Sequence, residues 1–301
     1  MSLVAPAEPP PIAGVRRSFV EARGVRFHVT EAGEGAPVLL LHGWPQHHYA
    51  YRELLADPPA GLRLIAPDLP GYGWSGPAPH RWGKQDVADD LLALLDALAV
   101  ERALLVGHDW GGWIGFLLAL GAPERFSAYL ALNIAHPWNT PRTLLPHLWR
   151  FAMYQPAMAA LGVPLQRRTP FVERMIFGTA VRDHAAVAQE DVRWFADRFR
   201  DPVVARSGRD TYRTFLLREL PRLARQPERR RATIPVRMLF GEADLAIHPA
   251  LAAPETAQAD DYALEQVPGC GHFVVDERPR LVRERLVALA AAHPSATPAA
   301  V

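Results

Sequence analysis

Residues 104–112 read Leu-Leu-Val-Gly-His-Asp-Trp-Gly-Gly, an apolar run that leads directly into a Gly-x-Asp-x-Gly turn. The residues behind this turn have a helical pattern, so the stretch predicts a strand, a tight turn and a helix in succession. Glycines on both sides of Asp109 permit a strained turn that lifts one side chain above the edge of a sheet. A carboxylate in that position attacks saturated carbon and forms an ester, which water must then cleave.

Two further polar groups follow apolar runs that are typical of buried strands. Asp244 ends the stretch Phe-Gly-Glu-Ala-Asp at 240–244, and His272 lies in Gly-Cys-Gly-His-Phe at 269–273. The order nucleophile, acid, histidine predicts that Asp244 orients His272, and that His272 activates the water that cleaves the ester. That role requires a neutral His272 and an Asp109 that is ionised at the start.

The composition excludes several functional classes. The 301 residues are 49% hydrophobic, and their formal charge of +1 gives no strong field toward nucleic acid or an anionic membrane. Cys270 is the only cysteine and Lys84 the only lysine, and the histidines lack metal-ligand spacing. Without an apolar run long enough to span a membrane or a signal-peptide core in residues 1–17, we expect a cytoplasmic protein. Neither a metal nor another cofactor is implied.

The remaining pattern alternates buried strands with helices, which is typical of a mostly parallel, twisted sheet flanked by helices in an α/β protein. An antiparallel edge is expected over 17–30, and amphipathic helices over 87–99 and 280–292. The buried strands are predicted at 38–41, 62–66, 103–106, 128–132, 236–240 and 262–267.

Strand signals vanish between residues 136 and 227, where prolines separate short helical stretches. We therefore predict a core domain made of residues 17–135 and 228–293, with a helical cap domain inserted at 136–227. The Ala/Pro-rich ends, residues 1–16 and 294–301, are expected to be a disordered arm and a disordered tail. A monomer and a homodimer both stay open.

Over about residues 19–289 the chain resembles the α/β-hydrolase superfamily, in particular its aspartate-nucleophile branch of soluble epoxide hydrolases and haloalkane dehalogenases. His-Gly-Trp-Pro at 42–45 is similar to the His-Gly-x-Pro motif of that family, and Asp-Leu-Pro-Gly-Tyr-Gly-Trp-Ser at 68–75 to its following loop. The resemblance implies an α/β-hydrolase fold and a Trp44–Pro45 bond that is often cis. It also implies an oxyanion hole made by the backbone N–H groups of Trp44 and Trp110.

Some relatives carry their acid after the strand that follows the nucleophile helix. This chain has the amide Asn133 there, which leaves the role of the acid to Asp244. Four other histidines lie near the motifs and are expected to be structural: His42, His47, His48 and His108.

The leaving group separates the two activities of the branch. Opening an epoxide creates an alkoxide that needs a proton donor, whereas a halide needs only N–H donors. Tyr212, in Thr-Tyr-Arg, resembles one ring-opening tyrosine of epoxide hydrolases. Tyr154 resembles the other, although an extra residue allows a shifted alignment with Arg150 or Met153 in its place. Dehalogenases usually have asparagine where this chain has Trp44, or a second tryptophan in the cap, and a cap tryptophan of this chain could have that role. Trp110 fits both activities.

These features favour an epoxide hydrolase that needs no cofactor and converts a small-molecule epoxide and water to a vicinal diol. Its aromatic cap residues motivate bulky or aryl-substituted epoxides as substrates. The expected pocket residues are Trp44, Trp110, Trp149, Met153, Phe215 and Phe273. A haloalkane dehalogenase is the alternative enzyme, and a non-catalytic ligand-binding member of the fold is a third possibility.

Overall fold

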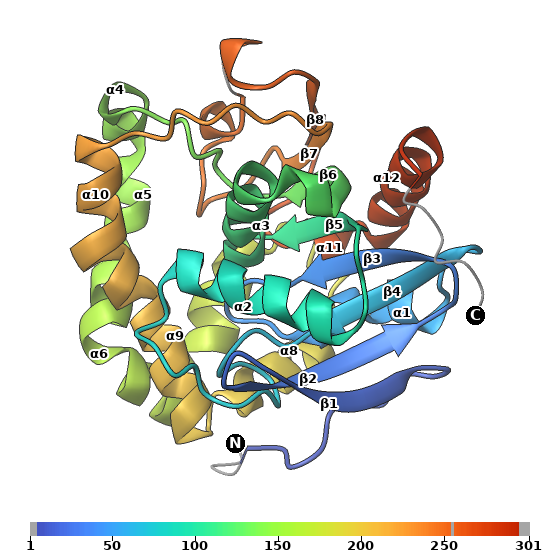
Figure 1. Ribbon diagram of the computed structural model, residues 1–301. Coiled ribbons are helices and arrows are strands. Elements are labelled where there is room, and N and C mark those ends of the chain that lie inside the picture. Colours follow the sequence, from blue (N-terminus) through green and yellow to red (C-terminus); the bar gives the residue numbers. More distant parts are fainter. Residues whose placement is uncertain (1–4, 254–255, 295–301) are drawn as a thin grey trace.

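The computed structural model describes residues 5–253 and 256–294, and an eight-stranded sheet runs through it (Figure 1). The order across the sheet is β1-β2-β4-β3-β5-β6-β7-β8. The first two strands form an antiparallel edge with β4, and all the other neighbours are parallel. The strands are β1 (Arg16–Ala22), β2 (Val25–Ala32), β3 (Ala36–Leu41), β4 (Leu62–Pro67), β5 (Ala103–His108), β6 (Phe126–Leu132), β7 (Val236–Gly241) and β8 (Tyr262–Val267).

The predicted α/β fold and its strands are therefore confirmed. Strands β5 and β6 are buried throughout, which explains why their sequences are continuous apolar runs. By contrast, β1 is mostly exposed because it has a neighbour on one side only. The turn after β5 therefore lies at the buried centre of the sheet.

Helices cover both faces of the sheet. Helices α2 (Lys84–Ala97) and α3 (Trp110–Gly121) pack together on one face, with α3 against β5 and β6. On the other face, α1 (Arg52–Ala56) and α11 (Val274–Glu277) lie with α12 (Pro279–Ala292). Short 3₁₀ turns complete the connections: η1 (His48–Tyr51), η2 (Pro123–Arg125), η6 (Pro249–Leu251) and η7 (Thr256–Gln258).

Between β6 and β7 the described chain contains helices and no strand, in the stretch where the sequence predicts a cap. We call this set the inserted helices; Figure 1 shows several of them gathered beside the sheet, on the side away from α12. They are α4 (Pro141–Leu144), η3 (Leu145–His147), α5 (Leu148–Ala152), α6 (Gln155–Arg168), the π-helix η4 (Phe171–Phe177), α7 (Gly178–Ala180), α8 (Gln189–Arg198), α9 (Pro202–Thr214), the π-helix η5 (Phe215–Glu219) and α10 (Leu220–Arg225).

The described part of the N-terminal arm lies along the core. Residues 5–15 form no helix or strand, but the carbonyl group of Ala7 accepts a hydrogen bond from Trp74 at 2.9 Å. Ile12 and Val15 pack against the hydrophobic core. The arm that the sequence predicts as disordered over 1–16 is thus held in part by apolar contacts. Most of the predicted tail lies outside the described residues, and no described helix is long and apolar enough to cross a membrane.

Candidate active site

Asp109 occupies the sharp turn from β5 to α3. Its φ of 50° and ψ of −122° are strained values for a residue with a side chain. The turn brings backbones so close that a Cβ atom on Gly107 would collide with Gly111, and one on Gly111 with the carbonyl group of Leu41. The flanking glycines thus have the role that the sequence predicts, and the Asp109 carboxylate lies at the carboxyl end of the sheet.

His272 lies between two carboxylates, as predicted. Its Nε2 atom is 3.6 Å from Oδ1 of Asp109, and its Nδ1 atom is 2.8 Å from Oδ2 of Asp244. The other oxygen of Asp244 accepts hydrogen bonds from the backbone N–H groups of Ala246 and Ile247, at 2.7 and 3.0 Å. The loops that follow β7 and β8 therefore bring acid and histidine to the nucleophile.

The charges of these three groups depend on one another. Burial lowers the pKa of His272, but the carboxylates of Asp244 and Asp109 outweigh burial and raise the pKa to about 10. Burial likewise opposes the charge of Asp244, yet the neighbouring His272 holds the pKa of Asp244 below its ordinary value. The raised pKa leaves His272 protonated at neutral pH, whereas the sequence predicts a neutral base.

The backbone of Trp44 faces the nucleophile. Its N–H group donates a hydrogen bond of 2.9 Å to Oδ2 of Asp109, and the Trp44–Pro45 peptide bond is cis. Gly43 permits this approach, because a Cβ atom there would meet the Asp109 carboxylate. The N–H group of Trp44 thus faces Asp109 as the resemblance implies. Its role in an oxyanion hole, and the contribution of the N–H group of Trp110 at the start of α3, stay predictions.

The two predicted tyrosines lie together above this site. Tyr154, just before α6, and Tyr212, in α9, have ring centroids 5.5 Å apart, and both rings contact the indole of Trp44. Burial and the charge of Asp109 raise the pKa of both hydroxyls, so both are protonated at neutral pH. The alternatives for Tyr154 line the same cavity, but Arg150 donates to the backbone carbonyl of Asp244, and Met153 is 60% exposed.

Two adjoining cavities meet at Asp109 and Tyr154. One is lined by Trp110 and Phe215, the other by Trp44, Tyr212, His272 and Phe273, with Met153 at the rim. Trp149 lines neither cavity and is 57% exposed, so its predicted place in the pocket is wrong. The reason is the phase of α5, which turns Leu148 and Phe151 toward the cavity and Trp149 away from it.

The comparisons with known proteins agree with this geometry. Residues 36–279 match the family described as alpha/beta hydrolase fold. The chain belongs to this family. It is 29% identical to the AB hydrolase superfamily protein YfhM of Bacillus subtilis, over 91% of this chain and 97% of YfhM. It is also 29% identical to haloalkane dehalogenase 2 of Mycobacterium bovis, over 90% of this chain and 93% of that protein.

Epoxide hydrolases are also among the relatives of this alpha/beta hydrolase. The epoxide hydrolase of Caballeronia sordidicola is 42% identical, but the alignment spans only 40% of this chain and 38% of that protein. Among solved structures, the epoxide hydrolase CorEH is similar with a TM-score of 0.76 and 25% identity, over 92% of this chain and 99% of CorEH. Epoxide hydrolase A from Mycobacterium thermoresistibile is similar with a TM-score of 0.75 and 26% identity. The match covers 94% of this chain and 100% of that hydrolase.

Asn133 and His108 support the candidate catalytic groups of this hydrolase. Asn133 donates a hydrogen bond of 2.8 Å to Oδ2 of Asp244, the oxygen that also faces His272. His108, whose pKa is lowered to about 4 chiefly by burial, donates through Nε2 to the backbone carbonyl of His272 at 2.8 Å. The position of Asn133 directly after β6, at the same sheet edge as Asp244, was the signal that pointed to its role.

Glu277 joins the loop of His272 to the inserted helices. Its buried carboxylate accepts hydrogen bonds from the N–H groups of Gly271, Arg182 and Asp183, at distances from 2.8 to 3.1 Å. The N–H group of His272 itself donates to the carbonyl of Ala180 at 2.8 Å. We call these contacts the seam between the histidine loop and the end of α7.

Within the described residues, His28, His48 and Asp68 form a buried group that has the residue types of a metal site. Both histidines already direct their Nδ1 atoms to Asp68, at 2.9 and 2.8 Å. The carboxylate also accepts hydrogen bonds from the N–H groups of His48 and Trp74. These bonds satisfy Asp68, which therefore anchors the loop after β4 and lines neither cavity at Asp109.

Proposed function

We propose that this protein is an epoxide hydrolase that adds water to an epoxide through a covalent ester on Asp109. The observation that carries the proposal is the pair of buried, protonated hydroxyls of Tyr154 and Tyr212 beside the carboxylate of Asp109. Such a pair supplies the proton that an epoxide oxygen needs as it leaves carbon. The full-length similarity to solved epoxide hydrolases supports the same activity.

In the first step, a carboxylate oxygen of Asp109 attacks an epoxide carbon, and the bond between this carbon and the epoxide oxygen breaks. A tyrosine hydroxyl gives its proton to that oxygen, which leaves a hydroxyalkyl ester and a tyrosinate. His272 carries a proton in this step, because its pKa is raised by the neighbouring carboxylates. No base is required for this step, so a protonated histidine is compatible with it.

In the second step, the ester has removed the charge of Asp109, one of the two carboxylates that raise the pKa of His272. The pKa of His272 therefore falls when a base is needed. His272 first gives up its proton, which returns through solvent to the tyrosinate. Neutral His272 then takes a proton from water, the hydroxide attacks the carbonyl carbon of Asp109, and the N–H of Trp44 stabilises the oxyanion. The acyl C–O bond breaks, His272 protonates the diol oxygen, and the proton left on the Asp109 carboxyl passes back to His272.

The substrate class follows from the walls of the cavities. Trp110, Phe151 and Phe215 provide a broad aromatic and apolar lining next to Asp109. We infer that bulky or aryl-substituted epoxides are preferred over small aliphatic ones. Faster turnover of a small aliphatic epoxide than of styrene oxide would contradict this preference.

The deciding experiment supplies styrene oxide and, separately, 1-bromobutane, and measures diol and free bromide. We expect diol. A single turnover in heavy-oxygen water should place the label in Asp109 before it reaches the product, because water attacks the carbonyl carbon of the ester. Bromide without diol would overturn the proposal, and the absence of both products would favour a ligand-binding protein.

A haloalkane dehalogenase is the second candidate. The indole N–H of Trp110 is buried and lines the cavity at Asp109. Among the described residues it faces the hydroxyl of Tyr212 without a well-formed hydrogen bond, so a halide ion could take its place. The indole N–H of Trp44, in contrast, donates to Gln166 at 2.9 Å. The similarity to haloalkane dehalogenase 2 also favours this candidate, and bromide release in the same assay would identify it.

A further inference from the structure

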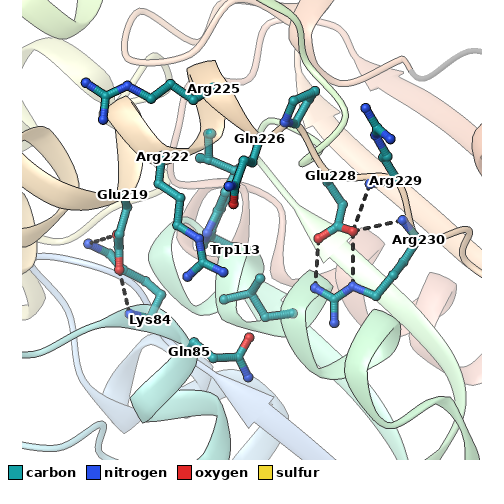
Figure 2. A pocket seen from close by; sticks show the side chains of 13 residues that line it. Lys84, Gln85, Trp113, Glu219, Arg222, Arg225, Gln226, Glu228, Arg229 and Arg230 are labelled. Atoms are coloured by element: carbon teal, nitrogen blue, oxygen red, sulfur yellow. Dashed lines mark hydrogen bonds and ion pairs between the residues drawn. The ribbon is translucent and has the colours of Figure 1, made fainter.

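The only lysine of the chain is buried between the core and the inserted helices. Lys84 begins α2 and is 1% exposed. Its ammonium donates to the carbonyl of Thr211 at 2.6 Å and pairs with the carboxylate of Glu219 at 2.8 Å. Glu219 also accepts a hydrogen bond from the backbone N–H of Lys84. Figure 2 shows this ion pair on one wall of a groove whose floor includes Trp113.

A buried ammonium needs an explanation because it costs more than an apolar side chain of the same size. Burial lowers the pKa of Lys84, and Glu219 opposes that change. Other contacts already hold α9 on the core: the hydroxyls of Tyr72 and Thr211 are 2.6 Å apart, and Thr214 donates to the carbonyl of Arg81 at 2.6 Å. Attachment of the helix alone therefore does not account for the charge.

The ammonium contacts two parts of the site at once. It lies 4.5 Å from the ring centroid of Trp110, the residue after the nucleophile, in cation–π geometry. The carbonyl that it binds belongs to Thr211, the residue before Tyr212. At Phe215 the helix changes from α to π, a change that shifts backbone hydrogen bonds and is frequent at functional sites.

We propose that Lys84 is a positioning residue. Its ammonium holds the ring of Trp110 and the turn of α9 that carries Tyr212 in the positions that ring opening at Asp109 requires. The rings of Trp110 and Tyr212 meet edge to face with centroids 5.6 Å apart, so a shift of either displaces the other. The inference rests on the proposed function, since it assigns a purpose to Lys84 in the ring-opening step.

The first experiment separates ring opening from ester cleavage in single turnovers. Lys84→Met keeps an apolar stem of similar length, and Lys84→Met combined with Glu219→Gln avoids an unpaired carboxylate. The matched control is Gln85→Met, an exposed residue of the same groove. We expect both Lys84 variants to form the Asp109 ester about 10- to 100-fold more slowly, since misplacement by about 1 Å has effects of this size. Cleavage of the ester should change by less than about threefold.

Each outcome of that experiment decides a claim. Ester formation at the wild-type rate in folded Lys84→Met would overturn the role of Lys84 and leave the proposed function intact. An equal slowing of both steps would indicate a general loss of structure and also overturn the role. Absence of diol from the wild-type protein together with absence of an ester in His272→Gln would overturn the proposed function and this inference with it.

A second measurement needs no substitution of Lys84. Because the chain has one lysine, isotopic labelling of lysine gives a single side-chain Cε signal in NMR spectra. We expect the Trp110 ring to shift this signal away from the position of an exposed lysine. Formation of the ester in His272→Gln should move the signal again, since Asp109 loses its charge. An unmoved signal on ester formation would contradict the coupling between Lys84 and the reacting groups.

Discussion

Asp109, His272 and Asp244 follow the ends of parallel strands, whereas Tyr154 and Tyr212 belong to helices inserted between β6 and β7. The carboxylates accept short hydrogen bonds from loop backbone and from Asn133, and Asp244 in turn holds the imidazole of His272. The tyrosine rings are instead held by edge-to-face and stacked aromatic contacts with partners distant in sequence. In the proposed mechanism, the covalent chemistry therefore takes place at the sheet edge, and the inserted helices supply the groups that recognise the leaving group.

The largest effect is expected at the sheet edge. Asp109→Ala removes the group that forms the ester, and diol formation should fall by about 10⁴-fold or more, as for removal of other nucleophiles. Diol release from styrene oxide measures the loss, and far-ultraviolet circular dichroism checks the fold. Residual activity within tenfold of the wild type would mean that another group attacks the substrate.

The next effect separates the two steps on that same edge. His272→Gln removes the base but keeps Asp109, so ring opening should continue while ester cleavage slows by about 10²–10⁴-fold. The mass of the intact protein should increase by the mass of one substrate molecule, and the added mass should persist. A variant that neither gains mass nor releases diol would show that His272 is also needed for alkylation.

Changes on the helical side test the other half of the comparison. Tyr212→Phe and Tyr154→Phe each remove one proton donor, and each should slow ring opening by about 10- to 100-fold, within the range for general acids. The rate of ester formation is the measurement, and the half-buried Tyr49 supplies a control as Tyr49→Phe. Normal ring opening by Tyr212→Phe would remove Tyr212 from the acid role.

The smallest effect is on stability and depends on pH. The pKa of His272 is raised from its ordinary 6.5 to about 10, so protonated His272 stabilises the folded state. This contribution is complete below the unfolded pKa and is lost as pH rises through about 10. The melting temperature of the wild type should therefore fall more steeply through that pH than that of His272→Gln. Parallel curves for the two proteins would contradict the raised pKa.

The two regions also differ in how well the sequence predicts them. Strand ends and flanking glycines are local patterns, so the positions of Asp109, Asp244 and His272 followed from the chain itself. The orientation of a helix depends on what packs against it, which is why Trp149 was placed in the pocket although α5 turns it outward. Likewise, the hydrogen-bond partners of Lys84, Thr211 and Glu219, are more than 100 positions away in the sequence, and no local pattern predicts them.

The seam at Glu277 limits where substrate and product can enter and leave the candidate active site. Because Gly271, Arg182 and Asp183 share one buried carboxylate, the helices cannot lift at residues 180–183 without drawing His272 away from Asp109. We therefore expect the inserted helices to stay closed over the core at residues 180–183. The amide protons of these residues should exchange slowly with solvent. Substrate and diol would then pass by the opposite wall, formed by Leu144, Leu148 and Phe151, where the helices can part while the catalytic groups stay in register.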